Sequence, residues 1–203
     1  YPADIAVYKD TIVAVGDVKE YIGEETEVID AKGRYLVPGM IDGHIHSECS
    51  KLSITSYAKA VVPHGTTSMI SGLDEYISVS NLEGLQEIFA EIKQSPLKVF
   101  WGAPYKTPYT VPQSTVSFNF NKDVHEMVQK WPECYGVWET VTEFVQEEDE
   151  DTLGAIAEAY KNNLPVFGCA PMARGTKLNG YLCSGVRLDH ESYDHEEVVE
   201  KMR

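Results

Sequence analysis

The sequence has little that would suit a membrane, a secretory pathway or a nucleic acid. No apolar run approaches the roughly 20 residues that a membrane span needs. No basic-then-apolar signal peptide opens the chain. Basic residues are scarce, 17 Lys and Arg against 32 Asp and Glu, and the net charge of −15 would repel phosphate backbones. We therefore expect a protein that binds neither membranes nor nucleic acids.

Cysteine is also sparse, and its spacing is not that of a disulfide framework. The chain carries Cys49, Cys134, Cys169 and Cys183, with no CxxC pair and no small-secreted-domain context. Reduced thiols and a cytoplasmic location are expected. With 203 residues, 43% of them hydrophobic and 24% charged, the chain suits one soluble domain and a small appendage.

The most informative stretch is residues 37–46, VPGMIDGHIH. Apolar residues and a Pro-Gly turn predict a short buried strand that ends in His-x-His. Residues i and i+2 of a strand point to the same face, so His44 and His46 are expected to project together, roughly 6.6 Å apart. Polar groups on a buried strand are costly unless they are paired or bind a metal. The pair predicts half of a metal site.

The first 38 residues predict a small β domain. Strands over 4–8 and 11–16 flank a turn at Lys9-Asp10, and strands over 27–30 and 34–37 flank a second turn at 31–33. Because the chain starts almost inside a strand, its natural beginning is expected to lie upstream.

Residues 39–203 alternate between predicted strands and helices, which favours parallel βα units. About six units are expected, with helices over 53–64, 81–94, 123–130, 151–162, 177–184 and 194–203, and a long loop over 103–120. A complete (β/α)8 barrel needs eight units over about 250 residues. The expected fold is therefore an α/β TIM-like barrel that is incomplete, either a piece of a longer protein, which we favour, or a barrel completed by another chain or segment.

Metal-ligand residue types recur where the predicted strands end. In strand order they are His44 and His46, Glu75, Glu139, Cys169 and His190. Barrel enzymes place functional groups at the carboxyl ends of their strands. Borderline divalent metals accept imidazole, carboxylate and thiolate ligands, so these positions predict a metal site.

Several ordered motifs resemble one family. VPGMIDGHIHSE is similar to the first-strand signature of the amidohydrolase superfamily of metal-dependent hydrolases. The segments AVVPHGTT (60–67), GCAP (168–171) and LDHE (188–191) narrow the resemblance to the microbial adenine deaminase branch, over nearly the whole chain. The resemblance implies a (β/α)8 barrel, with residues 1–38 as part of a small β-sandwich that the far C-terminus completes.

The resemblance also implies individual roles. His44 and His46 match ligands of the more buried metal, Glu139 matches a carboxylate that bridges two metals, and His190 matches a further ligand. Cys169 stands where the family carries a His ligand. It is either a softer ligand or an inert buried thiol.

Two carboxylates are expected beside the metals. Glu75 matches a family Glu near the substrate and would shuttle protons or hydrogen-bond the purine; an exposed loop carboxylate is the alternative. Glu48 matches a Glu that would orient a metal ligand. The chain departs from the family at Gly72 and Asp74, where the family has Asp and His, and a strand-8 Asp is not in this sequence.

The remaining histidines and the acidic run are expected to be structural. His64, His125 and His195 are interpreted as surface or capping residues. The acidic run at 147–151 is interpreted as a solvated helix start.

The reaction that the resemblance implies is hydrolytic deamination of adenine to hypoxanthine and ammonia in purine salvage, with a binuclear Mn, Fe or Zn centre. A related amidohydrolase acting on another cyclic amide or amine is one alternative, and a truncated or degenerate non-catalytic homologue is another. A homo-oligomer is left open. Weak or no turnover is expected from these residues unless the two remaining strands are supplied.

Overall fold

The structure is a computed structural model that describes residues 2–107, 112, 116 and 118–203. It consists of two compact units, Tyr1–Pro38 and Gly39–Arg203. The central part of the loop predicted over residues 103–120 lies outside the described residues. None of the described helices is long and apolar enough to cross a bilayer.

The first unit contains the predicted N-terminal hairpin. Strands β1 (Asp4–Tyr8) and β2 (Thr11–Gly16) pair antiparallel, with Asp4 opposite Gly16. Lys9 turns the chain with a positive φ of 57°. A short 3-10 helix, η1 (Lys19–Tyr21), follows.

The second predicted hairpin, over residues 27–37, is wrong. The turn forms, because Arg34 N donates to Ala31 O (3.0 Å), but no strand flanks it. Ile29 and Tyr35 are 81% and 99% exposed. Apolar side chains with no described surface to pack against give the backbone no reason to pair.

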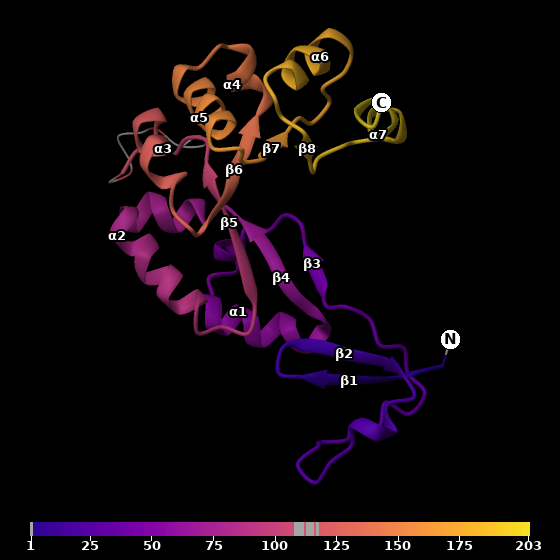
Figure 1. Cartoon of the computed structure of the whole chain (residues 1–203). Helices are drawn as coiled ribbons and strands as arrows, with labels where there is room; N and C mark the ends of the chain where they lie inside the picture. Colours follow the sequence, from indigo (N-terminus) through magenta and orange to yellow (C-terminus); the bar gives the residue numbers. More distant parts are fainter. Residues whose placement is uncertain (1, 108–111, 113–115, 117) are drawn as a thin grey trace. The chain divides into compact units, whose positions relative to one another are not determined.

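The second unit is a parallel sheet with the strand order β3-β4-β5-β6-β7-β8, which curls as half of a barrel (Figure 1). The strands are β3 (Met40–Asp42), β4 (Thr66–Ser71), β5 (Lys98–Pro104), β6 (Cys134–Val141), β7 (Val166–Cys169) and β8 (Leu188–Asp189). Every neighbouring pair is parallel. The expected incomplete TIM-like barrel is thus confirmed.

Helices connect successive strands, as parallel pairing requires. They are α1 (Ile54–Val61), α2 (Asp74–Ile92), α3 (Lys122–Val128), α4 (Thr142–Gln146), α5 (Glu150–Lys161), α6 (Gly175–Cys183) and α7 (His195–Lys201), with 3-10 turns η2 (Ser47–Ser50) and η3 (Val62–His64). Side chains of Ser53, Asn121, Asp149 and Asp194 cap four of them by accepting from the backbone N–H three residues on.

Two helices differ from their predictions in a way that matters below. Helix α2 begins at Asp74, seven residues earlier than predicted, and breaks at Asn81, where φ is 57°. The apolar spacing that starts at Asn81 therefore marks only the part of α2 that follows the break. Helix α4 was not predicted, because β6 runs past Glu139 and five residues are too short to show a period.

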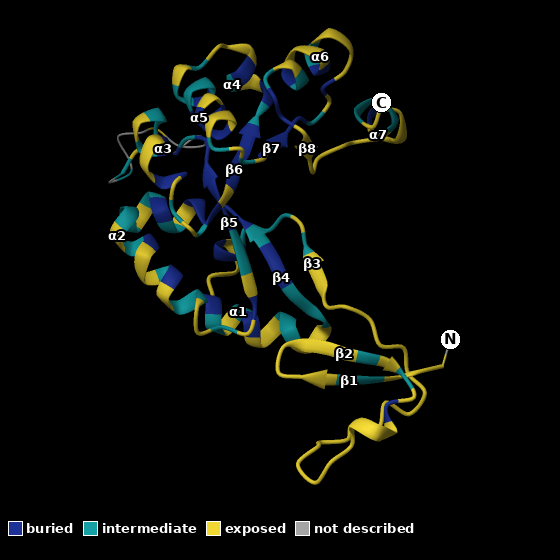
Figure 2. Cartoon of the chain, viewed as in Figure 1, coloured by how far each residue is buried: buried dark blue, intermediate teal, exposed yellow. Residues whose placement is uncertain are grey.

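Buried residues lie along the central strands and on the helices of the second unit (Figure 2), and they form two core clusters. One joins α2 to β4 and β5, through residues such as Met69, Leu85 and Trp101. The other joins α5 and α6 to β6 and β7, through residues such as Val137 and Tyr181. The predicted apolar stripe of α2 packs here, with Leu85 and Phe89 fully buried.

Candidate metal centre

The two strand-1 histidines follow the strand rather than lie in it. Strand β3 ends at Asp42, whose Oδ1 accepts the backbone N–H of His44 (3.2 Å). The rings of His44 and His46 lie 5.2 Å apart at 68°, edge to face. The expectation that both project to one face of a strand is therefore wrong, because the extended geometry stops before the first histidine.

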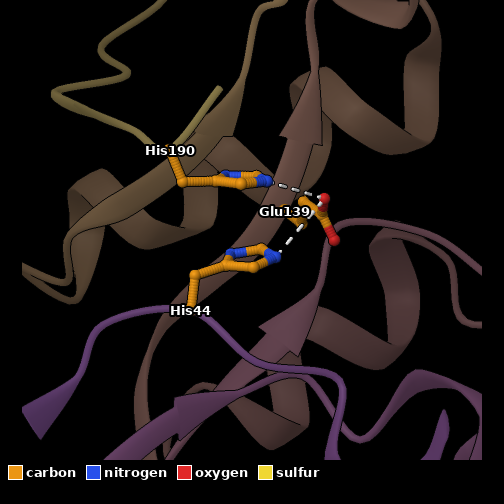
Figure 3. A group of neighbouring side chains, drawn as sticks. All are labelled: His44, Glu139 and His190. Atoms are coloured by element: carbon orange, nitrogen blue, oxygen red, sulfur yellow. Dashed lines mark ion pairs between the residues drawn. The ribbon is translucent and has the colours of Figure 1, made fainter. Parts of the chain in front are cut away.

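Glu139 connects these histidines to the rest of the sheet. It lies within β6, is 8% exposed, and directs its two oxygens to different partners. Oε1 lies 3.3 Å from His190 Nε2 and 3.7 Å from His44 Nε2 (Figure 3). Oε2 lies 2.9 Å from His46 Nε2. One carboxylate thus faces three imidazoles, two that follow β3 and one that follows β8.

His44 and His190 form one side of this arrangement. Their rings stack at 3.5 Å and 13°, and His44 also stacks on Trp138 at 4.3 Å. His190 Nδ1 lies 2.9 Å from Gly168 O, a carbonyl that can only accept, so Nδ1 carries the proton. With Nδ1 committed to the backbone carbonyl, Nε2 is the ring nitrogen that faces Glu139 and is left to meet a metal.

Charge in the site follows from this crowding. Burial alone would raise the pKa of Glu139, but hydrogen bonds with His190 and His46 outweigh it and lower the pKa to about 2. Burial, and then His190, lower the pKa of His44 to about 4. A neutral His44 beside an ionised Glu139 is a donor pair suited to a divalent cation.

Cys169 lies beside His190 at the end of β7. It is buried, and Cys169, His190 and Glu191 can bring one ligand atom each within 4.8 Å of the others. Burial, and then Glu139, raise the pKa of its thiol to about 12. The thiol is therefore protonated at neutral pH, and only a bound cation would make it a thiolate.

Carboxylates surround the other ring nitrogen of His46. Glu48, Asp74 and Glu75 each have an oxygen 3.8–3.9 Å from His46 Nδ1. The side chains of Glu48 and Asp74 are 2% and 6% exposed, whereas that of Glu75 is 57% exposed. The sequence singles out Asp74 only as a departure from the family pattern, not as a site residue. Its place directly after β4, beside Glu75, was the available signal.

The donors fit a metal. Among the described residues, His46 Nδ1 and Glu48 Oε1 are buried and have no hydrogen-bond partner. Buried polar atoms are normally satisfied. Ligand atoms that converge within 4.8 Å include the groups His44/Glu139/His190 and His46/Asp74/Glu139. Imidazole with carboxylate suits Zn, Mn or Fe.

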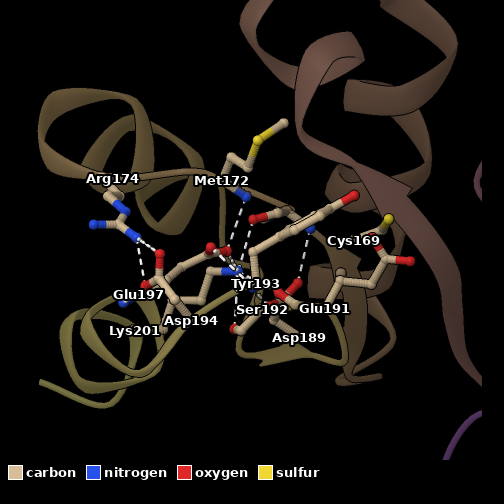
Figure 4. Close-up of polar contacts among 12 residues, drawn as sticks. Cys169, Met172, Arg174, Asp189, Glu191, Ser192, Tyr193, Asp194, Glu197 and Lys201 are labelled. Atoms are coloured by element: carbon tan, nitrogen blue, oxygen red, sulfur yellow. Dashed lines mark hydrogen bonds and ion pairs between the residues drawn. The ribbon is translucent and has the colours of Figure 1, made fainter.

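A polar cluster on α7 holds the β7 and β8 ends in place (Figure 4). Lys201 Nζ lies 2.7 Å from each of Ala170 O, Asp189 Oδ2 and Glu197 Oε1. Glu197, fully buried, accepts the backbone N–H groups of Met172 (2.9 Å) and Tyr193 (3.1 Å). We call this Lys201–Asp189–Glu197 set the α7 clasp. It fixes the segments that carry Cys169 and His190.

The other histidines do not join these groups. His64 and His195 are exposed, as expected. His125 was expected at the surface, and that was wrong: it is fully buried, its Nε2 donates to Pro104 O (2.9 Å) and its Nδ1 accepts from Gln129 (3.0 Å). Its polar flanks in the sequence gave no sign of this, because α3 packs on α5 through that face.

A curled parallel α/β sheet that gathers imidazoles and carboxylates around its strand ends is the arrangement of TIM-like barrel enzymes. No protein-family model matches the chain. Over its whole length it is 77% identical to adenine deaminase 1 of Desulfotalea psychrophila, 64% to adenine deaminase 1 of Latilactobacillus sakei and 62% to adenine deaminase 4 of Rhizobium meliloti. The chain belongs to the adenine deaminase family. It spans 34% of the length of each of these relatives.

Proposed function

We propose that the protein takes part in the hydrolytic deamination of adenine, in which adenine and water give hypoxanthine and ammonia. The identities of 62–77% to proteins named adenine deaminase support this reaction. The observation that carries it is Glu139, which presents one oxygen to His44 and His190 and the other to His46.

The proposed cofactor is a pair of divalent ions, of Mn, Fe or Zn. His44, His46, Glu139, Cys169 and His190 are the residues proposed to hold them. Bound there, a divalent metal would supply hydroxide at neutral pH by lowering the pKa of water toward about 7.

Glu75 and Glu48 are proposed to act beside these ligands. The neighbouring His46 ring lowers the pKa of Glu75 to about 2, and the Glu75 side chain is half exposed. An exposed, ionised carboxylate can accept a proton from the attacking water and deliver it to the departing amino group. Glu48 is buried against His46 Nδ1 and would orient that ring.

The remaining expectations also stay proposals. The proposed substrate is the free purine, the proposed location is the cytoplasm, and self-association is proposed without a defined interface. Four cysteines without a disulfide support the location.

The test is a hybrid enzyme. The matched third of the D. psychrophila relative is replaced by this chain, and ammonia release from adenine is measured for the hybrid and the relative. Turnover within about tenfold of the relative is expected, and Glu139→Gln in the grafted chain should abolish it. An active relative with an inactive, folded hybrid would contradict the proposal. Turnover of another cyclic amine or amide, but not adenine, would assign a different substrate.

A further inference from the structure

Strand β6 is irregular around Glu139. Between Val137 and Thr140, β6 has one residue more than the stretch of β7 that pairs with it. Successive side chains of a regular strand point to opposite faces, yet Trp138 stacks on His44 at 4.3 Å and Glu139 Oε1 lies 3.7 Å from Nε2 of the same ring. A bulge of this kind re-aims a side chain, so the extra residue brings both neighbours to the site.

The backbone of the bulge is held by partners on both sides, because a bulge disrupts the regular ladder. On the β5 side, Tyr105 N donates to Trp138 O (2.5 Å). On the β7 side the partner is a buried side chain of α6: the hydroxyl of Tyr181 donates to Thr140 O and accepts the backbone N–H of Cys169 (3.0 Å). A carbonyl can only accept and an N–H can only donate, so the phenol uses its proton for one strand and a lone pair for the other.

Gly168 leaves the room that this hydroxyl occupies. A Cβ on Gly168 would lie 2.4 Å from Tyr181 Oη and 2.5 Å from Val186 Cγ1. A side chain at position 168 would therefore push the phenol out from between the strands. The Gly168 carbonyl in turn accepts the Nδ1–H of His190 (2.9 Å).

Three of the proposed metal ligands are thus attached to backbone that one hydroxyl contacts or adjoins. Thr140 directly follows Glu139, and the donated N–H is that of Cys169 itself. Gly168, one residue earlier, orients His190 through its carbonyl. Because a binding constellation needs its groups held to within about 0.5 Å, the residue that fixes this backbone bears on all three ligands.

We propose that Tyr181 is a positioning residue of the metal centre, whose hydroxyl fixes the β6 bulge against β7 and so sets the directions of Glu139, Cys169 and His190. Tyr181 acts through the backbone and does not itself bind the metal. This inference rests on the metal centre of the proposed function and adds a residue from outside the set of ligands. The competing role is purely structural: the hydroxyl stabilises the fold, and the ligands keep their directions without it.

The variant Tyr181→Phe separates the two roles, because it removes one oxygen atom and keeps the buried ring. Cation counting by elemental analysis and competition with a chelator give the number of Zn²⁺ ions that the metal-free protein binds and their affinity. The visible spectrum of the Co²⁺-loaded protein reports the geometry of the ligands. Tyr181→Phe should bind Zn²⁺ roughly 10- to 100-fold more weakly, the loss typical of partners that orient metal ligands, and its Co²⁺ bands should shift.

Two variants are matched controls. Ile156→Val removes a methyl group from the same buried cluster as Tyr181, so it lowers stability and leaves the hydroxyl in place. Tyr160→Phe makes the same chemical change at an exposed position of α5. Both should keep the Zn²⁺ affinity and the Co²⁺ spectrum of the wild type. Circular dichroism checks the folding of each variant, and urea unfolding gives its stability.

A second variant keeps the inference testable if Tyr181→Phe does not fold. Tyr181→3-fluorotyrosine retains both hydrogen bonds, but its oxygen is a weaker acceptor for the N–H of Cys169. Zn²⁺ affinity should fall by less than the loss expected for Tyr181→Phe, and the Co²⁺ bands should again shift. An unchanged affinity and spectrum in this folded variant would contradict the positioning role.

The inference is overturned if Tyr181→Phe binds Zn²⁺ within about threefold of the wild type and keeps its Co²⁺ spectrum. A loss of equal size in Ile156→Val would also overturn it, because destabilisation alone would then explain the weaker binding. A wild type that binds no divalent cation would remove the inference together with the metal centre. If Tyr181→Phe behaves as expected but the hybrid enzyme does not release ammonia from adenine, the proposed reaction alone is contradicted.

Discussion

The two sides of Glu139 offer a cation different chemistry. On the β7–β8 side, a neutral His44, His190 and the Cys169 thiol supply nitrogen and sulfur, and the α7 clasp holds the segments that carry His190 and Cys169. On the β3–β4 side, His46 is surrounded by Glu48, Asp74 and Glu75, which supply oxygen. Softer ligands select Zn²⁺ and oxygen ligands favour Mn²⁺, so the two sides should differ in the metal they prefer.

The largest expected effect is the loss of cation binding on both sides of Glu139 by a single substitution. Glu139→Gln removes the charge that both groups of histidines share, and affinity for both cations should fall by more than about 100-fold. Isothermal titration of the metal-free protein measures it. Glu143→Gln, an exposed glutamate on α4, is the matched control. A variant that kept one cation at full affinity would show that Glu139 serves one side only.

Breaking the α7 clasp should weaken cation binding on the β7–β8 side alone. Lys201→Met leaves Asp189 and Glu197 without their shared cation, and breaking such a largely buried pair costs about 3 kcal/mol of unfolding free energy. Denaturant unfolding measures the loss, and cation counting should show the deficit on the His190 side.

Lys161→Met removes a more exposed partner, which pairs with Glu158, and serves as the control for that measurement. It should cost clearly less unfolding free energy than Lys201→Met, because an exposed ion pair is screened by solvent. Equal effects of the two lysine variants would remove the special role of the clasp.

His125 has a hydrogen-bond partner for each ring nitrogen and lies apart from the metal-ligand groups, so it serves as a comparison for the site histidines. Burial lowers the pKa of His125 to about 4, so the folded protein keeps it neutral while the unfolded chain protonates near pH 6.5. Its contribution to stability is present above pH 6.5 and is lost as the pH falls toward 4. Wild type should lose about 2 kcal/mol more than His125→Gln between pH 7 and 4.5, with or without metal. Unfolding free energy is measured with urea at both pH values. If wild type and His125→Gln lost the same amount between pH 7 and 4.5, this assignment would be contradicted.

The smallest expected effect is on metal preference. Cys169→Ser replaces a soft donor by a hard one, so Zn²⁺ affinity should fall by roughly tenfold while Mn²⁺ affinity stays within about threefold. Competition between the two metals measures the ratio. Cys183→Ser, an exposed cysteine, is the control. An unchanged ratio would assign Cys169 to the inert buried thiols.

The sequence predicts the order of the sheet and most of the residues that meet in it, because chain order and strand order coincide in a parallel βα fold. It does not predict that Asp74 turns inward, which depends on a left-handed Leu73 and on the space beside Gly72. Nor does it separate His44 from His46, since that follows from where β3 ends. The local sequence pattern predicts where the strands lie, whereas the direction of the side chains at the strand ends depends on contacts with residues distant in sequence.

The position of Glu139 between two sets of donors has a thermodynamic consequence. A cation on one oxygen draws electron density from the other and adds a positive charge nearby, so the second ion should bind more weakly than the first. Linkage makes this negative cooperativity reciprocal: whichever side fills first penalises its neighbour by the same factor. A cation-binding curve with two phases is therefore expected from the sharing of Glu139 alone, and the different chemistry of the two sides would add to it.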